Sequence, residues 1–173
     1  MSPTLHTDRL SLRPIADADL PQVFAGLSHP DIIRYYGVSF QHLEATREQM
    51  RWYAAPEQHW FAVCDRTSGA FLGAAGLNDH DTRHRKAEFG CWLLPPHWGR
   101  AYMGEFSPAL LDFGHQHLGL HRIEAFVDSR NTPCLKAFAK LPFVHEGCLR
   151  ECERKDEAWI SLEVFAHLVG DVP

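Results

Sequence analysis

One stretch of this chain has the residue types and spacing to bind a phosphate. From Glu88 to Phe106 it reads EFGCWLLPPHWGRAYMGEF, which predicts an apolar strand, a break at two prolines, a turn containing glycine, and a helix. A strand that enters a helix through small residues leaves the first N–H groups of that helix without partners. The helix dipole adds partial positive charge at the same place, so this segment predicts a site for a phosphorylated ligand.

Histidine and cysteine, by contrast, show no spacing that is typical of a metal site. The twelve histidines and five cysteines are scattered, without HxxxH or CxxC motifs. The densest group, Asp79-His80-Asp81 with His84, falls in a polar turn, which favours a solvated hairpin. We therefore predict no metal site. The odd number of cysteines favours free thiols in a reducing compartment.

Length and composition place the chain among ordinary globular proteins. Its 173 residues, 45% hydrophobic and 23% charged, predict one domain over residues 1–173 with a substantial core. A formal charge of −5 argues against nucleic acid as a partner, because such partners need clustered Lys and Arg. No apolar run has the length of a membrane span or the pattern of a signal peptide, so we expect a cytoplasmic protein with no membrane partner.

The order of the predicted elements indicates an α+β chain with a central, mostly antiparallel sheet. Alternation predicts a first strand at residues 9–13, and apolar spacing predicts a helix that begins after Asp17 as its N-cap. The other expected helices cover residues 31–36, 44–55, 100–118 and 132–140, and the other expected strands cover residues 60–64, 70–77, 87–94, 122–127, 144–150 and 159–165.

Five short motifs occur in a characteristic order along the chain. They are TDRLSLRP at 7–14, FLGAAGL at 71–77, AEFGCWLL at 87–94, WGRAYM at 98–103, and NTPC leading to LPFVHEG at 131–147. Together they resemble the GNAT acyltransferase superfamily and, within it, the Rim-type ribosomal-protein N-acetyltransferases. The resemblance implies a GNAT fold, in which a mixed, mostly antiparallel sheet is flanked by helices and splayed between its fourth and fifth strands.

Three residues depart from the pattern of that family. Ala101 stands where the loop usually has glycine, and it suits the role if the backbone there is helical. Met103 replaces a small residue, and its side chain either crowds the cofactor or packs into the core. Pro142 replaces a glycine in a later turn.

The resemblance implies direct transfer of an acetyl group from acetyl-CoA to an amine. The backbone of Trp92, Leu93 and Leu94 is then expected beside the pantetheine arm, with one N–H facing the thioester oxygen. Asn131 is expected to contact the cofactor, although it also has the features of a helix N-cap. The residues expected to hold the diphosphate are Gly99, Arg100, Ala101, Tyr102, Met103 and Gly104, with Arg100 as a charge partner.

Two side chains are candidates for proton transfer under the same resemblance. Glu88 shares a strand face with Gly90 and Trp92, and from there its carboxylate could take the proton of the amine. Cys134 stands where this branch often has a serine that donates to the leaving sulfur, and we expect the start of a helix to lower its thiol pKa. The alternatives are a surface glutamate and a small buried cysteine.

Specificity for the acceptor is expected from residues 28–59 and 150–157, which offer aromatic and acidic side chains suited to a cationic amine. These are Tyr35, Tyr36, Glu44, Glu48, Trp52, Tyr53, Glu151 and Glu153. The alternative is a pair of amphipathic helices that covers a sheet. The acceptor is a protein N-terminus or a small-molecule amine, and a homodimer is compatible with the sequence. The alternative function is a catalytically silent or altered acyl-CoA-binding module of the same fold.

Overall fold

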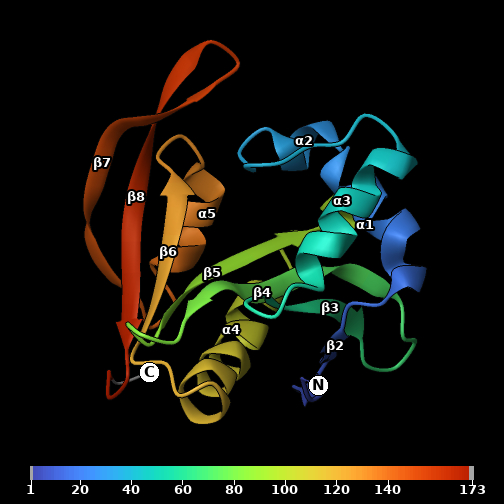
Figure 1. Cartoon of the computed structure of the whole chain (residues 1–173), viewed down its shortest axis with the longest axis horizontal. Coiled ribbons are helices and arrows are strands. Elements are labelled where there is room, and N and C mark those ends of the chain that lie inside the picture. The colour runs from blue at the N-terminus through green and yellow to red at the C-terminus, as the bar shows by residue number, and fades with distance from the viewer. Residues whose placement is uncertain (1, 172–173) are drawn as a thin grey trace.

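A single sheet with strand order β1-β2-β3-β4-β5-β6-β8-β7 runs through the computed structural model, which describes residues 2–171 (Figure 1). All neighbouring strands are antiparallel except β5 and β6, which are parallel. The predicted α+β class with a mixed, mostly antiparallel sheet is confirmed. The strands are β1 Leu5–His6, β2 Leu10–Pro14, β3 His59–Asp65, β4 Phe71–Asp81, β5 Lys86–Leu93, β6 Arg122–Asp128, β7 Val144–Lys155 and β8 Ala158–Leu168.

Helices cover both faces of the sheet (Figure 1). Apolar side chains of α1 and α3 pack against one face, and those of α4 and α5 pack against the other. Within the described residues, no helix is long and apolar enough to cross a membrane. The helices are α1 Leu20–Leu27, α2 Pro30–Ile33, α3 Leu43–Tyr53, α4 Tyr102–Asp112 and α5 Thr132–Phe138.

Two of the predicted helix boundaries are wrong. Asp17 begins a 3-10 turn, and Asp19 is the N-cap residue of α1, where the guanidinium of Arg13 binds its carboxylate at 2.7 and 2.8 Å. The helix predicted over residues 100–118 is interrupted, because α4 begins at Tyr102 and becomes a π-helical turn at Phe113–His117.

The parallel strands β5 and β6 are joined over only three residue pairs. These pairs are Lys86↔Arg122, Ala87↔Ile123 and Glu88↔Glu124. At this joined end Glu124 accepts from both Lys86 and Arg122 at 2.8 Å, which ties the strands together. Beyond the third pair the strands diverge (Figure 1), as the family resemblance implied for the strands at 87–94 and 122–127.

Two glycines in the sheet make room for one buried tryptophan. Gly76 of β4 and Gly90 of β5 are register partners, and the indole of Trp60 lies against both. A Cβ atom at Gly76 would be 2.6 Å from Cγ of Trp60 and 2.7 Å from the carbonyl oxygen of His59. Only 5% of Trp60 is exposed, so its position depends on these glycines.

Replacing Gly76 by alanine tests this packing. We expect Gly76→Ala to lower the free energy of unfolding by about 2 kcal/mol, because the new methyl group meets an indole and a backbone oxygen that cannot both move away. Chemical denaturation would measure this change. Gly37→Ala is the matched control, since nothing lies within 4 Å of a Cβ at that position. Equal stability of both variants would contradict the account of Trp60.

Candidate active site

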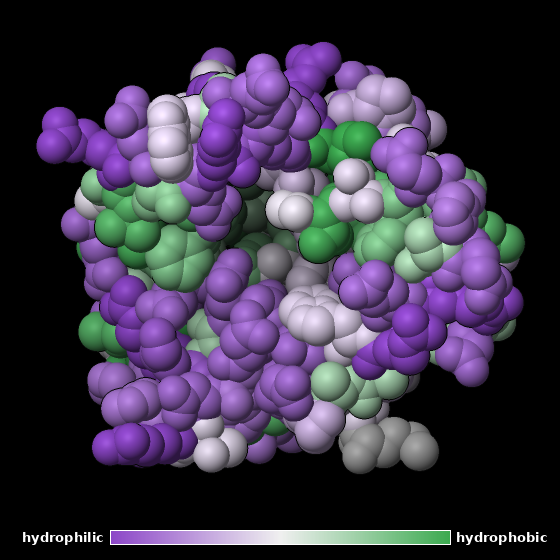
Figure 2. Space-filling model, turned by 45° about the horizontal axis from the view of Figure 1, so that its top comes forward, coloured by the Kyte–Doolittle hydropathy of each residue, from purple (hydrophilic) through white to green (hydrophobic). Residues whose placement is uncertain are grey.

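A cavity of about 740 Å³ opens where β5 and β6 diverge. Figure 2 shows this face of the molecule hollowed near its centre. The strand residues 88–91 and 125–128 form its walls, and the loop from Tyr35 to Phe40 covers it. Glu48, Gln49 and Trp52 of α3 and Asn131 and Cys134 at the start of α5 complete the lining. The gap in the sheet therefore coincides with a hollow into which polar groups converge.

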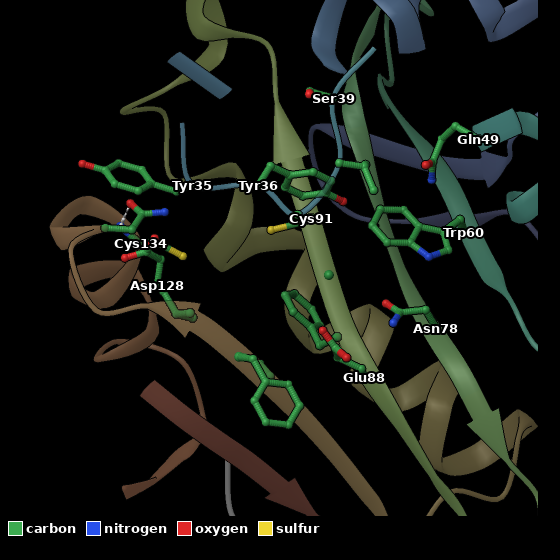
Figure 3. Close-up of a pocket in the computed structure, with 18 of the residues that line it drawn as sticks. Tyr35, Tyr36, Ser39, Gln49, Trp60, Asn78, Glu88, Cys91, Asp128 and Cys134 are labelled. Carbon is green, nitrogen blue, oxygen red and sulfur yellow. Dashed lines mark hydrogen bonds between the residues drawn. The ribbon is translucent and has the colours of Figure 1, made fainter. Parts of the chain in front are cut away.

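Glu88 brings a carboxyl group with an altered pKa into this cavity (Figure 3). Burial raises the pKa of Glu88 to about 7, and repulsion from Asp79, Glu124 and Glu153 adds to the effect, while a hydrogen bond from Asn78 opposes it. A carboxyl group with this pKa is partly ionised at neutral pH and can accept a proton. The structure therefore places Glu88 in a pocket, as expected, and not on the surface.

Two cysteines line the same cavity. Cys134 lies in the first turn of α5, where Oδ1 of Asn131 accepts from its backbone N–H at 3.3 Å, so the predicted N-cap is confirmed. The expectation of a lowered thiol pKa is wrong, because burial raises the pKa of Cys134 to about 11. Cys91 of β5, which the sequence did not single out, has its pKa raised by burial too. Both are therefore neutral thiols that can donate a proton.

The loop from Gly99 to Gly104 has the donors for a phosphate group. Among the described residues, the six backbone N–H groups from Gly99 to Gly104 have no protein acceptor, and Glu105 is the first to bond, to the carbonyl of Ala101 at 3.2 Å. Successive free N–H groups at the start of a helix form an anion-binding concavity. Met103 packs against the core and so leaves this concavity open.

Ala101 does not meet the condition, a right-handed helical backbone, under which alanine would suit this position without strain. Its φ of 60° and ψ of 22° are left-handed, a region that favours glycine. Gly99, with φ of 73°, is left-handed as well. The family's usual glycine at the position of Ala101 therefore has a conformational reason, and this chain carries the strain of a side chain there.

Arg9 fixes the loop from outside, a role that nothing in its local sequence indicated. Its Nη2 donates to the carbonyl of Arg100 at 3.0 Å, and its Nε donates to Glu105 at 2.6 Å. Its guanidinium also lies 4.7 Å from the ring centroid of Tyr102. Arg9 and the exposed Arg100 thus place two cations beside the free N–H groups.

The end of β5 is used differently from the expectation for Trp92, Leu93 and Leu94. The Trp92 indole points away from the cavity and donates to the hydroxyl of Tyr53 at 3.3 Å. The N–H of Leu94 donates to the carbonyl of Leu72 in β4 at 2.8 Å, so it cannot also serve a ligand. Backbone groups alternate sides along a strand, and therefore only Leu93 of the three points its N–H toward the gap. Its carbonyl already accepts from Trp98 at 2.7 Å.

The residues expected to select the acceptor divide into two groups. Tyr35, Tyr36, Glu48 and Trp52 line the cavity. The others lie elsewhere: Glu44 pairs with Arg47, Tyr53 packs on Trp60 behind the cavity wall, Glu151 lies in a separate hollow on β7, and Glu153 acts on Glu88 only through its charge.

Comparisons with known proteins agree with this geometry. A family model described as an acetyltransferase (GNAT) domain matches residues 9–144. The uncharacterized N-acetyltransferase YoaA of Bacillus subtilis is 32% identical over 157 residues, which cover 87% of this chain and 88% of that protein. Spermidine N(1)-acetyltransferase of Escherichia coli K12 is 26% identical over 151 residues, which cover 84% of this chain and 77% of that protein. The structure of spermidine N-acetyltransferase from Vibrio cholerae, in complex with CoA and spermine, has a TM-score of 0.86 at 22% identity and covers 94% of this chain and 97% of that one, so it shares the GNAT fold.

A glycine at position 101 tests the strain in the loop. We expect Ala101→Gly to raise the free energy of unfolding by about 0.5 kcal/mol, because relief of a left-handed alanine exceeds the added entropy of the unfolded chain. In the matched control, Ala109→Gly within α4, we expect a loss of about 1 kcal/mol. Thermal denaturation of both variants measures the difference, and equal destabilisation would show that Ala101 carries no strain.

Proposed function

Because this chain belongs to the GNAT acetyltransferase family and is an N-acetyltransferase of that type, we propose that it transfers an acetyl group from acetyl-CoA to a primary amine by direct attack in a ternary complex. The observation that carries the proposal is that β5 begins with a candidate base and leads into a loop with free N–H groups. Glu88 lies in the cavity at its start, and the six free N–H groups of residues 99–104 follow its end. A base on β5 and an anion site in the loop that follows this strand can align two reactants.

The residues present fit acetyl-CoA, which would supply the acetyl thioester. The N–H groups from Gly99 to Gly104 would hold the diphosphate, with Arg9 and Arg100 as nearby cations. The N–H of Leu93 faces the gap and would bind the pantetheine arm. Asn131 would contact the cofactor from the cavity wall while its side chain caps α5.

Two side chains of the cavity would move the protons of the reaction. Glu88 would take the proton that the amine loses, since a base with a pKa of about 7 is ionised in part at working pH. Cys134 would donate a proton to the departing CoA sulfur, since burial keeps its thiol neutral. Both groups line one cavity, so neither has to move far.

The acceptor is inferred to be a cationic amine. Carboxylates and aromatic rings, such as Glu48, Glu88, Tyr36 and Trp52, line the cavity, and both attract a positive charge. The Rim-type motif order supports a protein N-terminal amine, whereas the spermidine acetyltransferases among the relatives support a polyamine. The alternative of a silent acyl-CoA-binding module is favoured by the strained Ala101.

Release of CoA thiol from acetyl-CoA separates the two functions. With a panel of polyamines, amino acids and short peptides with free N-termini, we expect turnover of at least one cationic amine above the rate without acceptor. A thiol-reactive dye measures the release, and calorimetry measures CoA binding. Tight CoA binding without thiol release for any amine would favour the silent module and contradict the proposed transfer.

The pH profile of the reaction tests Glu88 as the base. Because protonated Glu88 cannot accept a proton, we expect kcat/KM to fall as the pH drops through about 7. Glu88→Gln should lower kcat about 100-fold and remove this inflection. Glu44→Gln, on the exposed side of α3, is the control and should keep the wild-type profile. An inflection that persists in Glu88→Gln would assign it to another group.

A further inference from the structure

One lysine ties the loop that covers the cavity to a distant hairpin. Nζ of Lys155 donates to the carbonyl oxygens of Ile33 and Tyr36, the latter at 2.6 Å. Lys155 is 119 residues from Tyr36 in sequence and is the last residue of β7. The C-terminal hairpin therefore holds the segment that leads from α2 into the cover of the cavity.

The turn between β7 and β8 places Lys155 close enough to bind the carbonyl groups of Ile33 and Tyr36. Lys155 pairs with Ala158, so only Asp156 and Glu157 form the turn, and their φ values of 47° and 65° are those of a type I′ turn. This tight turn puts Lys155 at the tip of β7, beside the loop. A charged ammonium with two carbonyl acceptors makes stronger hydrogen bonds than a neutral donor.

The side chain of Tyr36, the residue whose carbonyl oxygen Lys155 binds, points into the cavity. Figure 3 shows its ring extending across the cavity, with the hydroxyl on the side of Trp60. Burial raises the pKa of this phenol, and the charges of Tyr53, Cys91 and Glu88 add to the shift, so the phenol is neutral. Among the described residues, its hydroxyl makes no hydrogen bond with a protein group, so an oxygen is available to a ligand.

A second cation fixes the neighbouring tyrosine. The guanidinium of Arg130 lies 5.9 Å from the ring centroid of Tyr35 and is held by Asp128 at 2.7 Å. Tyr35 and Tyr36 are thus each positioned by a residue from the C-terminal half of the chain. The helix α2 cannot hold these two tyrosines in place, because it ends at Ile33 and both residues lie beyond its end.

We propose that Tyr36 binds the acceptor amine and that Lys155 is the positioning residue that holds it there. The phenolic oxygen of Tyr36 accepts a hydrogen bond from an N–H of the amine, on the side opposite Glu88, and leaves the nitrogen lone pair for the attack. This inference rests on the proposed function, and it assigns the β7–β8 hairpin a part in acceptor binding. Among the described residues, the side-chain hydrogen bonds of Lys155 go to Ile33 and Tyr36 and not to the loop at residues 99–104, so we expect CoA binding to be independent of Lys155.

Substitution of Lys155 tests the tie between hairpin and loop. Lys155→Met keeps the length of the side chain and removes both hydrogen bonds, whereas Lys155→Arg keeps a donor. We expect Lys155→Met to raise the KM for the acceptor about tenfold while the Kd for CoA stays within about twofold, because only the acceptor is misplaced. Lys155→Arg should recover part of this loss, and the neighbouring exposed Arg154→Met should behave as the wild type.

Two further readouts separate positioning from general stability. Hydrogen–deuterium exchange should show faster exchange at residues 33–40 in Lys155→Met and no change at residues 99–104. Tyr36→Phe should raise the acceptor KM without a change in exchange or in melting temperature, because only an oxygen is lost. An unchanged acceptor KM in either variant, or an equal rise in the Kd for CoA, would overturn the proposal.

The exchange measurement needs no acceptor, so it stands apart from the proposed function. If no amine were acetylated, the proposed function and the role of Tyr36 would both fail, and exchange would still decide whether Lys155 holds the loop. If turnover occurred and exchange at residues 33–40 were unchanged in Lys155→Met, the positioning role alone would be refuted.

Discussion

The loss of pairing between β5 and β6 after Glu88 is the constraint on which the rest of the site depends. Two parallel strands can be joined only through a long crossover, here supplied by α4, and they share three residue pairs. Where the pairing stops, each strand is left with backbone groups that need another partner. The divergence therefore creates both the cavity and a row of donors along its edge, and the ion pairs of Glu124 keep the other end closed.

Burial then sets the chemistry of the groups that face this gap. It raises the pKa of Glu88 to about 7 and also raises the pKa of Tyr36 and of Cys134, so a carboxyl group that titrates near neutral pH lies in the cavity beside neutral O–H and S–H donors. The negative charges of Asp79, Glu124 and Glu153 add to the rise in the pKa of Glu88. They act without direct contact, because charges interact more strongly through a region of low dielectric than through water. A positively charged acceptor would relieve this repulsion, which links binding of the amine to the ionisation of the base.

Sequence reasoning predicted the parts of this arrangement that depend on local patterns. The order of helices and strands along the chain and the cap at Asn131 follow from periodicity and side-chain type, and the gap beside residues 87–94 follows from the family resemblance of the motifs. It could not decide the backbone conformation of Ala101, which is left-handed in a loop that Arg9 contacts from the far N-terminal part of the chain. It was wrong about the pKa of Cys134, where burial outweighs a short helix. It could not separate Leu93 from Trp92 and Leu94, since only the register with β4 decides which N–H faces the gap. The role of Lys155 could not be predicted from local patterns, because its hydrogen-bond partners lie more than a hundred residues away in the sequence.

The central claim is that the strand gap and the loop after it form one site for CoA. Backbone amide chemical shifts during a titration with CoA test this claim most directly. The account predicts that the largest changes fall on residues 99–104 and on Leu93, with smaller ones at Asn131 and Cys134. Changes confined to another surface, such as the hollow at Cys148 and Cys152 on β7, with residues 99–104 unaffected, would contradict it.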